Sequence, residues 1–403
     1  METVQAPLAR RIGSIRSFLR TEAAGGIVLL LATITALIWA NSPLGDLYVD
    51  LWNRTLSFTI DGRGLSKDLG HWINDGLMVL FFLVVGLEIK RELLHGELAG
   101  RRQAMLPAAA AAGGAIVPAL LYLAFNLGGS GSHGWGVPMA TDIAFVVGVL
   151  ALLGSRVPLA LKVFVTALAI VDDLIAVLVI AFFYTGDIAT TWLGVAGGVM
   201  ALLVLANRVG VTRLPVYTLL GIALWIAVLQ SGVHATIAGV LLALTIPSRG
   251  EGSDGPSPLY RMEHGLHPWV AFGIMPLFAL ANAGVVLSAD ALSNLTSNVS
   301  LGIIFGLVVG KPLGITLSSL LLIRLRLADL PRGVTVRGML GAGCLAGIGF
   351  TMSLFVAELA FTDEAQADAA RLGILCASVI ATAIGVLVLV SAHRTNGTDD
   401  ADA

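Results

Sequence analysis

Residues 158–184 read PLALKVFVTALAIVDDLIAVLVIAFFY, an apolar run that carries two adjacent aspartates, Asp172 and Asp173, near its middle. As a helix, the run is long enough to cross the ~30 Å hydrocarbon core of a bilayer. Asp172 lies 14 residues beyond Pro158, which is roughly 21 Å at the rise of an α-helix, so both carboxylates fall close to mid-membrane. An ionisable group at that depth costs about 3 kcal/mol or more, and such a pair therefore predicts a functional site.

The whole chain shares the apolar character of this run. Its 403 residues are 57% hydrophobic and only 12% charged, with a mean hydropathy of +0.89, whereas ordinary soluble domains are about 25% charged. The net charge near -2, without a strongly basic block, argues against nucleic acid as a partner. Cys344 and Cys376 both lie in apolar runs and imply neither a disulfide framework nor a cysteine metal site. We therefore predict an all-α polytopic protein whose main partner is the lipid bilayer.

Hydropathy, with Pro, Gly and charge as punctuation, predicts about twelve transmembrane helices. They lie near residues 23–41, 72–90, 104–126, 134–154, 158–184, 191–207, 214–230, 234–247, 266–287, 300–323, 337–361 and 369–392. We assign 1–22 to an N-terminal tail, 23–392 to a single transmembrane transporter domain, and 393–403 to a disordered C-terminal tail. The exterior loop 41–71 contains the alternating stretch Leu56–Ile60 before Asp61-Gly62, which predicts a small β-hairpin and a candidate dimer contact. An ordinary surface loop is the alternative.

The basic residues orient the chain in the membrane. With a cytoplasmic N-terminus, 18 of the 24 Lys and Arg residues fall in inside loops and tails, and only Arg54, Arg63, Lys67 and Arg371 fall outside. Short cytoplasmic loops collect Lys and Arg. Because one missed span would destroy this bias, we expect an even number of spans with both termini in the cytoplasm.

Two further charged residues, Asp142 and Lys311, lie near the depth of the aspartate pair. Three carboxylates and one ammonium at a common level can form a cation site with its own counter-charge. Adjacent helical residues point about 100° apart, so one aspartate of the pair can face a water-filled path while the other faces a neighbouring helix. The alternative is that these charges only hold helices together, but a purely structural ion pair would not need a second aspartate next to it.

Glycine and proline predict a break in each of two spans. Gly136-Val137-Pro138 precedes Asp142, and Gly341, Gly343, Gly347 and Gly349 crowd the span that ends near Ser353. Unwound backbone at membrane depth survives only where it lines protein or water, and its helix ends carry partial charges that Asp142 and Lys311 have the right signs to neutralise. The interrupted spans are the fourth and the eleventh, each central in a three-span unit, which predicts inverted repeats with two broken helices crossing at mid-membrane. Close helix packing is the alternative reason for the glycines.

Several segments resemble the signature segments of the NhaA-type sodium/proton antiporters. They are GLEIKREL at 86–93, ATDIAF at 140–145, VDDL at 171–174, SGVHAT at 231–236, EHGLHPW at 263–269, GKPLG at 310–314 and GIGFTMS at 347–353. The likeness runs in order from about Ala23 to Ala392. It implies the NhaA-type fold, itself a type example of inverted repeats. It also implies a multi-pass antiporter of the bacterial inner membrane, a homodimer that expels Na+ or Li+ in exchange for entering H+. Such a protein is not an enzyme and needs no cofactor.

The resemblance also implies roles for particular residues. Asp173 would be the principal Na+ ligand, and Asp172 would share the site and exchange an ion pair with Lys311. The crossing would be lined or neutralised by Thr141 and Asp142.

Two further groups follow from the family pattern. Asp75 would lie in an access funnel. A cytoplasmic pH-control cluster would comprise Glu88, Arg91, Glu92, Arg261, Glu263, His264 and His267, with His234 similarly placed or simply packed in the core. Histidine suits pH control because its unperturbed pKa is near 6.5, whereas the Glu-His-x-x-His string at 263–267 lacks the order of a zinc-protease motif. Family members carry a further basic residue where this chain has Tyr260, so the family does not predict the activating pH of this chain.

Two other functions compete with antiport. A sodium-coupled symporter of an organic solute could use a similar broken-helix core, but it would need more polar groups at the crossing. An intramembrane aspartyl protease would use two aspartates on successive spans, such as Asp142 and Asp172. Those proteases typically present Gly-x-Gly-Asp, whereas residues 169–172 read AIVD.

Overall fold

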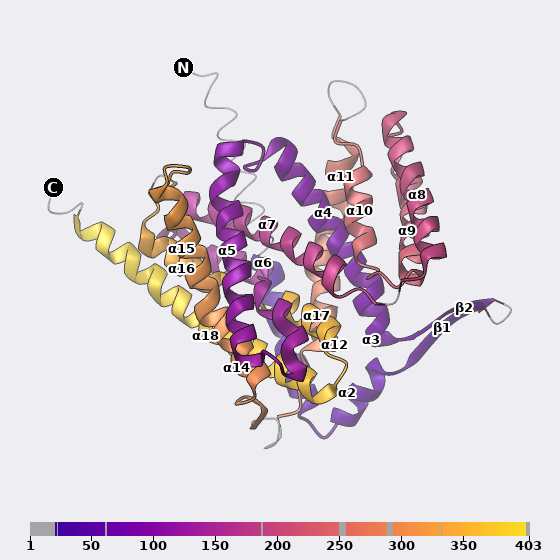
Figure 1. Ribbon diagram of the computed structural model, residues 1–403, viewed down its shortest axis with the longest axis horizontal. Helices are drawn as coiled ribbons and strands as arrows, with labels where there is room; N and C mark the ends of the chain where they lie inside the picture. The colour runs from indigo at the N-terminus through magenta and orange to yellow at the C-terminus, as the bar shows by residue number, and fades with distance from the viewer. Residues whose placement is uncertain are drawn as a thin grey trace.

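The computed structural model describes residues 21, 23–60, 63–186, 188–249, 255–287, 293–331 and 333–399, and apart from one two-stranded sheet its regular elements are helices (Figure 1). The first half comprises a helix Ala23–Ala40, α2 Gly45–Trp52, β1 Thr55–Ile60, β2 Arg63–Asp68, α3 Leu69–His71, η1 Trp72–Leu77, α4 Met78–His95, α5 Arg101–Asn126, η2 Ser130–Met139, α6 Ile143–Leu152, η3 Gly154–Arg156 and α7 Leu159–Phe183. The second half comprises α8 Thr190–Arg208, α9 Leu214–Gln230, α10 Ile237–Thr245, α11 Pro258–Trp269, η4 Val270–Ile274, α12 Met275–Asn282, α14 Asn298–Phe305, η5 Gly306–Gly310, α15 Lys311–Arg324, α16 Val336–Ala346, α17 Phe350–Ala360 and α18 Glu364–Asp399.

The predicted set of membrane spans is confirmed in class and order. Within the described ranges, eight continuous helices are long and apolar enough to cross a membrane, and two more spans are bent helix pairs. The shorter helices α9 and α10 occupy the two remaining predicted positions. Helix α10 begins only at Ile237 because residues 231–236 form turns. The predicted all-α fold with two broken helices is therefore present.

Small residues let several helices approach closely. Helices α5 and α15 lie side by side in Figure 1 and meet at Gly113 and Gly314, where a Cβ atom added to either glycine would overlap the backbone of the other. Helices α4 and α10 meet in the same way, since a Cβ at Gly239 would overlap the carbonyl oxygen of Val79. Close backbone contact of this kind is how helices associate in lipid, where the hydrophobic effect gives no drive between apolar surfaces.

Apolar side chains cover the outside of the molecule as well as its core. Phe182, Leu219 and Leu387 are 77%, 70% and 70% exposed, an arrangement that lipid favours and water does not. Helices α8 and α9 stand at one edge in Figure 1, and only Ala196 and Leu203 of α8 are buried. The charged groups considered below lie away from that edge, among the other helices.

The segment 41–71 contains the predicted hairpin. Strand β1 pairs with β2 in antiparallel register from Thr55↔Asp68 to Ile60↔Arg63, and the hairpin projects sideways from the bundle (Figure 1). Its tip, Asp61-Gly62, is outside the described residues. Before the hairpin, the Tyr48 hydroxyl fastens α2 to the end of α12 by donating to the Leu280 carbonyl at 2.8 Å. Burial raises the pKa of Tyr48 to about 12.

The two predicted tails are only partly described. Residues 1–20 and 22 of the N-terminal tail, and residues 400–403 at the other end, lie outside the described residues. Helix α18 runs through to Asp399, into the segment 393–403 for which the sequence predicted disorder.

The glycine contact between α5 and α15 predicts that one added methyl group lowers the stability of the protein. Gly314→Ala should lower the unfolding temperature in detergent, because overpacking a tight contact costs about 1–3 kcal/mol. Gly197→Ala on α8 is the matched control, since a Cβ there meets nothing within 4 Å and alanine favours a helix. Equal unfolding temperatures for the two variants would contradict the close contact.

Candidate functional site

The two interrupted spans meet at their breaks. The η2–α6 pair bends by 40° and the α16–α17 pair by 47°. Between the halves, the Asp142 N–H donates to the Ile348 carbonyl at 2.7 Å, so the two unwound segments are joined backbone to backbone. Gly347 permits a further close contact, between the α16–α17 break and η5, because a Cβ there would overlap the carbonyl oxygen of Leu307.

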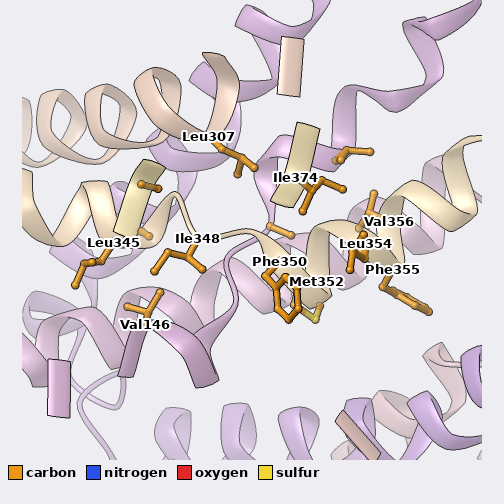
Figure 2. Close-up of a cluster of buried hydrophobic side chains, with 14 of the residues drawn as sticks. Val146, Leu307, Leu345, Ile348, Phe350, Met352, Leu354, Phe355, Val356 and Ile374 are labelled. Atoms are coloured by element: carbon orange, nitrogen blue, oxygen red, sulfur yellow. The ribbon is translucent and has the colours of Figure 1, made fainter. Parts of the chain in front are cut away.

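Apolar side chains surround the α16–α17 break. Figure 2 shows Ile348 in the connection between the helix halves, with Leu307 and Ile374 on one side of it and Val146 on the other. All four side chains are buried. Water is thereby kept from the backbone, and electrostatic interactions act at low dielectric, where they are strong and where an unpaired charge is costly.

Asp142 holds the two positive helix ends at the crossing. One carboxylate oxygen accepts from the Phe145 N–H at 3.0 Å, in the first turn of α6. The other accepts from the Thr351 N–H at 3.1 Å, in the first turn of α17, and from the Thr351 hydroxyl. A single negative charge thus serves two helix N-termini, where anions are favoured.

The two negative helix ends are met by donors from other elements. Thr141 donates its hydroxyl to the Ala346 carbonyl at the end of α16, at 2.9 Å. Ser353 donates to Val137 in η2 at 2.8 Å, and the Lys311 ammonium donates to the last carbonyl of η2, at Met139. The predicted neutralisation of helix ends by Asp142 and Lys311 is therefore present in the geometry.

Lys311 forms a buried ion pair with Asp172. Its Nζ lies 2.8 Å from both carboxylate oxygens, and the two side chains are 0% and 1% exposed. Lys311 directly follows the π-helical segment η5, a local widening that often occurs at functional positions. Because a buried ion pair barely offsets its own desolvation, this pair is poor evidence for stabilisation and better evidence for function.

Asp173 is the carboxylate at the crossing that forms no ion pair among the described residues. It is 2% exposed, and its Oδ1 has no hydrogen-bond partner among them. Its electrostatic neighbours are the acidic Asp172, Glu88 and Asp142, together with Lys311, which is already paired with Asp172. Such an oxygen can take up a proton or a small hard cation, which prefers oxygen ligands. No cluster of three or more His, Cys, Asp or Glu side chains suited to a resident metal ion occurs within the described ranges.

A second group of predicted residues gathers around α4 and α11. Arg91 pairs with Glu263 and, at 3.3 Å, with Glu92. His267 Nε2 lies 3.8 Å from Glu88 Oε1. Because Glu88 is buried and within electrostatic range of Asp173, this group is linked to the crossing.

The remaining predicted residues lie apart from these two groups or at their margin. The ring of His264 stacks on Tyr260 with centroids 3.7 Å apart, and Arg261 is exposed on α11. His234 lies in the turns before α10 and interacts electrostatically with Asp75, not with the Arg91 group. Asp75 is half-buried in η1, where its backbone carbonyl accepts from the Trp225 indole at 3.0 Å.

Sequence analysis missed the contacts of two residues at the crossing and one amide pair between η1 and α12. It quoted Thr351 and Ser353 as part of a motif but gave neither a partner, although both hydroxyls bond across to the other interrupted span. It also missed the reciprocal amide pair between Asn74 and Asn282, with N···O distances of 3.0 and 3.3 Å. The available signal was the placement of small hydroxyl residues directly after a glycine-rich break.

A bundle whose interrupted helices cross around buried charges of both signs defines a secondary ion transporter. The chain belongs to the Na+/H+ antiporter 1 family, whose model matches residues 16–389. A protein of Oleidesulfovibrio alaskensis named Na(+)/H(+) antiporter NhaA is 49% identical over 95% of each chain. Proteins of the same name from Shewanella loihica and Escherichia coli O1:K1 are each 52% identical, covering 92% of this chain and 95% and 96% of their own lengths.

The buried ion pair predicts non-additive effects on stability. Lys311→Met should destabilise the protein by about 3–5 kcal/mol, because it leaves Asp172 charged, buried and unpaired. The double variant Asp172→Asn with Lys311→Met should be more stable than the single variant, since neither charge remains. Unfolding in detergent measures both, with Lys67→Met at an exposed hairpin position as control. A double variant less stable than the single one would contradict the pairing.

Proposed function

We propose that Asp173 and Asp172, with Lys311 as counter-charge, bind Na+ or Li+ and protons in alternation at the helix crossing. Membership of the family makes the chain a Na+/H+ antiporter of a cell membrane, and not an enzyme. The observation that carries the assignment is the Asp173 carboxylate. It is buried, has an oxygen without a partner, and adjoins the Asp172–Lys311 pair. Thr141 adjoins Asp172 and lines the site beside it.

Competition for the same carboxylates couples the two ions. A Na+ ion that enters the site compensates the charge of Asp173 and displaces the proton that would otherwise neutralise it. It also draws Asp172 away from Lys311, because one carboxylate cannot serve both cations fully. Protonation reverses both effects. The site then carries either Na+ or protons across the membrane, and the two titrations belong to the coupled pair.

The same competition makes the exchange electrogenic. With two carboxylates available, we propose that more than one proton enters for each Na+ that leaves, so that net positive charge moves inward. Each such charge gains about 2.3 kcal/mol per 100 mV of membrane potential. The exit of Na+ is thereby driven by the potential as well as by the proton gradient, and no cofactor takes part.

We assign pH control to the group around α4 and α11. Glu88 is the connecting residue, because it lies between His267 and the electrostatic surroundings of Asp173. Arg91, Glu92 and Glu263 fix the charge beside it. Arg261 and His264 belong to the same helix, α11. His234 we assign instead to the access funnel with Asp75, its electrostatic neighbour.

The assembly follows from the hairpin and the charge bias. We propose a homodimer in the bacterial inner membrane, with both termini in the cytoplasm and β1–β2 on the exterior side. The hairpin projects from the bundle (Figure 1), and an isolated two-stranded hairpin is marginal in water. Pairing with a second copy would supply the missing contacts.

The competing functions find little support at the crossing. A protease dyad would need Asp142 and Asp172 free to share a water, yet Asp142 is engaged by two helix N-termini and Asp172 by Lys311. A symporter would need extra polar groups for its solute. The hydroxyls at the break already donate hydrogen bonds, Thr351 to Asp142 and Ser353 to the backbone carbonyl of Val137.

Asp173→Asn tests the ion site directly. The substitution keeps the shape but removes the titratable charge, so dissipation of ΔpH on adding NaCl to everted vesicles should be abolished across the whole pH range. Asp50→Asn, at an exposed position of α2, should behave as wild type, and both proteins should unfold normally in detergent. Undiminished exchange by a folded Asp173→Asn protein would sink the assignment.

Glu263→Gln tests the pH-control group. Exchange rises with pH because protons compete with Na+. Loss of the Glu263 carboxylate leaves Glu92 as the remaining ion-pair partner of Arg91 and removes a negative charge from the group, which disfavours protonation of the neighbouring histidines. The pH of half-maximal exchange should therefore fall by about half a unit, with the maximal rate retained. An unchanged profile, or a uniform loss of rate at every pH, would refute the proposed role.

A further inference from the structure

Lys162 is a buried ammonium that the ion site does not use. It lies in the first turn of α7 and is 8% exposed. Its Nζ donates to the Gly154 carbonyl in η3 at 2.8 Å. No carboxylate lies within ion-pair distance of Lys162 in the described part of the chain. Lys311, the other buried lysine, has Asp172 as its partner.

The position of Lys162 on α7 relates it to Asp173. The two residues are 11 positions apart, which is about 1100° of helical rotation, so they share one face of α7 roughly 16 Å apart along its axis. Thr166 lies on the same face and is half-buried, and its hydroxyl donates back to the Lys162 carbonyl at 3.0 Å. The face of α7 that carries Asp173, the carboxylate proposed to bind Na+, therefore begins with a buried positive charge.

Helix capping alone does not account for this charge. The Gly154 carbonyl follows the end of α6, and a cation there is favourable. A neutral donor would satisfy the same carbonyl without the cost of burying an unpaired ammonium. The Lys162 ammonium lies on the same face of α7 as Asp173. Its positive charge therefore points to an electrostatic effect on the ions that bind Asp173.

We propose that Lys162 is a positioning residue for the antiport reaction, whose charge sets the apparent affinity of Asp173 for Na+ from the side where α7 begins. The inference rests on the proposed role of Asp173. A fixed positive charge there weakens the binding of Na+ to Asp173 and, for the same reason, weakens the binding of a proton. The effect acts on binding and not on turnover, since Lys162 does not touch the ion.

The test is the Na+ dependence of exchange in everted vesicles, which present the cytoplasmic face to the added salt. Lys162→Gln keeps a donor for the Gly154 carbonyl but removes the charge. At a pH high enough that protons no longer compete with Na+, it should lower the KM for Na+ about fivefold with kcat unchanged. That factor is about 1 kcal/mol, the Coulomb energy of unit charges ~16 Å apart at an effective dielectric constant near 20. Lys162→Arg keeps the charge and should retain the wild-type KM.

Two controls separate a charge effect from a structural one. Arg156→Gln removes an exposed charge near the same end of α7 and should leave KM unchanged at 0.1 M ionic strength, where solvent screens it. Raising ionic strength with choline chloride should leave most of the difference between wild type and Lys162→Gln in place, because solvent ions screen buried charges only weakly. An unchanged or raised KM in Lys162→Gln would overturn the proposal, as would equal shifts in the Gln and Arg variants or a change confined to kcat and unfolding temperature.

Asp173→Asn measured in the same vesicles distinguishes failure of the proposed ion site from failure of the proposed role of Lys162. Normal exchange by Asp173→Asn would remove the proposed ion site itself. An inactive Asp173→Asn protein together with a wild-type KM in Lys162→Gln would leave that site intact and remove only the role of Lys162.

Discussion

The neutralisation of four helix ends in an apolar interior is the constraint on which the rest of the structure depends. Two spans break at mid-membrane, and each break exposes one positive and one negative end. Asp142 serves both positive ends. Lys311 serves one negative end at Met139, and Thr141 serves the other at Ala346. Without these groups the unwound backbone would stand unpaired at low dielectric, where each lost hydrogen bond costs several kcal/mol.

The carboxylates of the proposed ion site are the ones that do not neutralise helix ends. Both carboxylate oxygens of Asp142 accept hydrogen bonds from helix N-termini. Lys311, which donates to the C-terminal end of η2, forms an ion pair with Asp172. Asp173 is adjacent in the chain and so is held at the same depth, but within the described residues it forms no ion pair. Under the proposed function, a cation or a proton balances its charge. The transported ion then completes the electrostatics of the crossing, and the two ions exclude one another because both neutralise the same carboxylate.

Much of this was predictable, and the reasons are physical. Long apolar runs have few alternatives to a membrane helix, so the spans followed from hydropathy, and the Pro and Gly clusters located both breaks. The depth of Asp142, Asp172 and Lys311 followed from the rise per residue. The pairing of Asp172 rather than Asp173 with Lys311 was implied by the family resemblance and did not follow from residue spacing, since it depends on how α7 and α15 are rotated about their axes. The partners of Thr351 and Ser353 were missed for the same reason.

The sequence by itself determined that charged groups lie deep in a membrane, at one level, beside two interrupted helices. It could do so because charged residues within apolar runs, and Pro and Gly within predicted helices, are visible in the sequence. Both carry a free-energy cost in a membrane. The tertiary structure decided which charges meet, because contact depends on helix rotation and on close approach at glycines such as Gly347 and Gly314. It joined Glu88 to His267 and separated His234 from them, although the sequence had grouped all three.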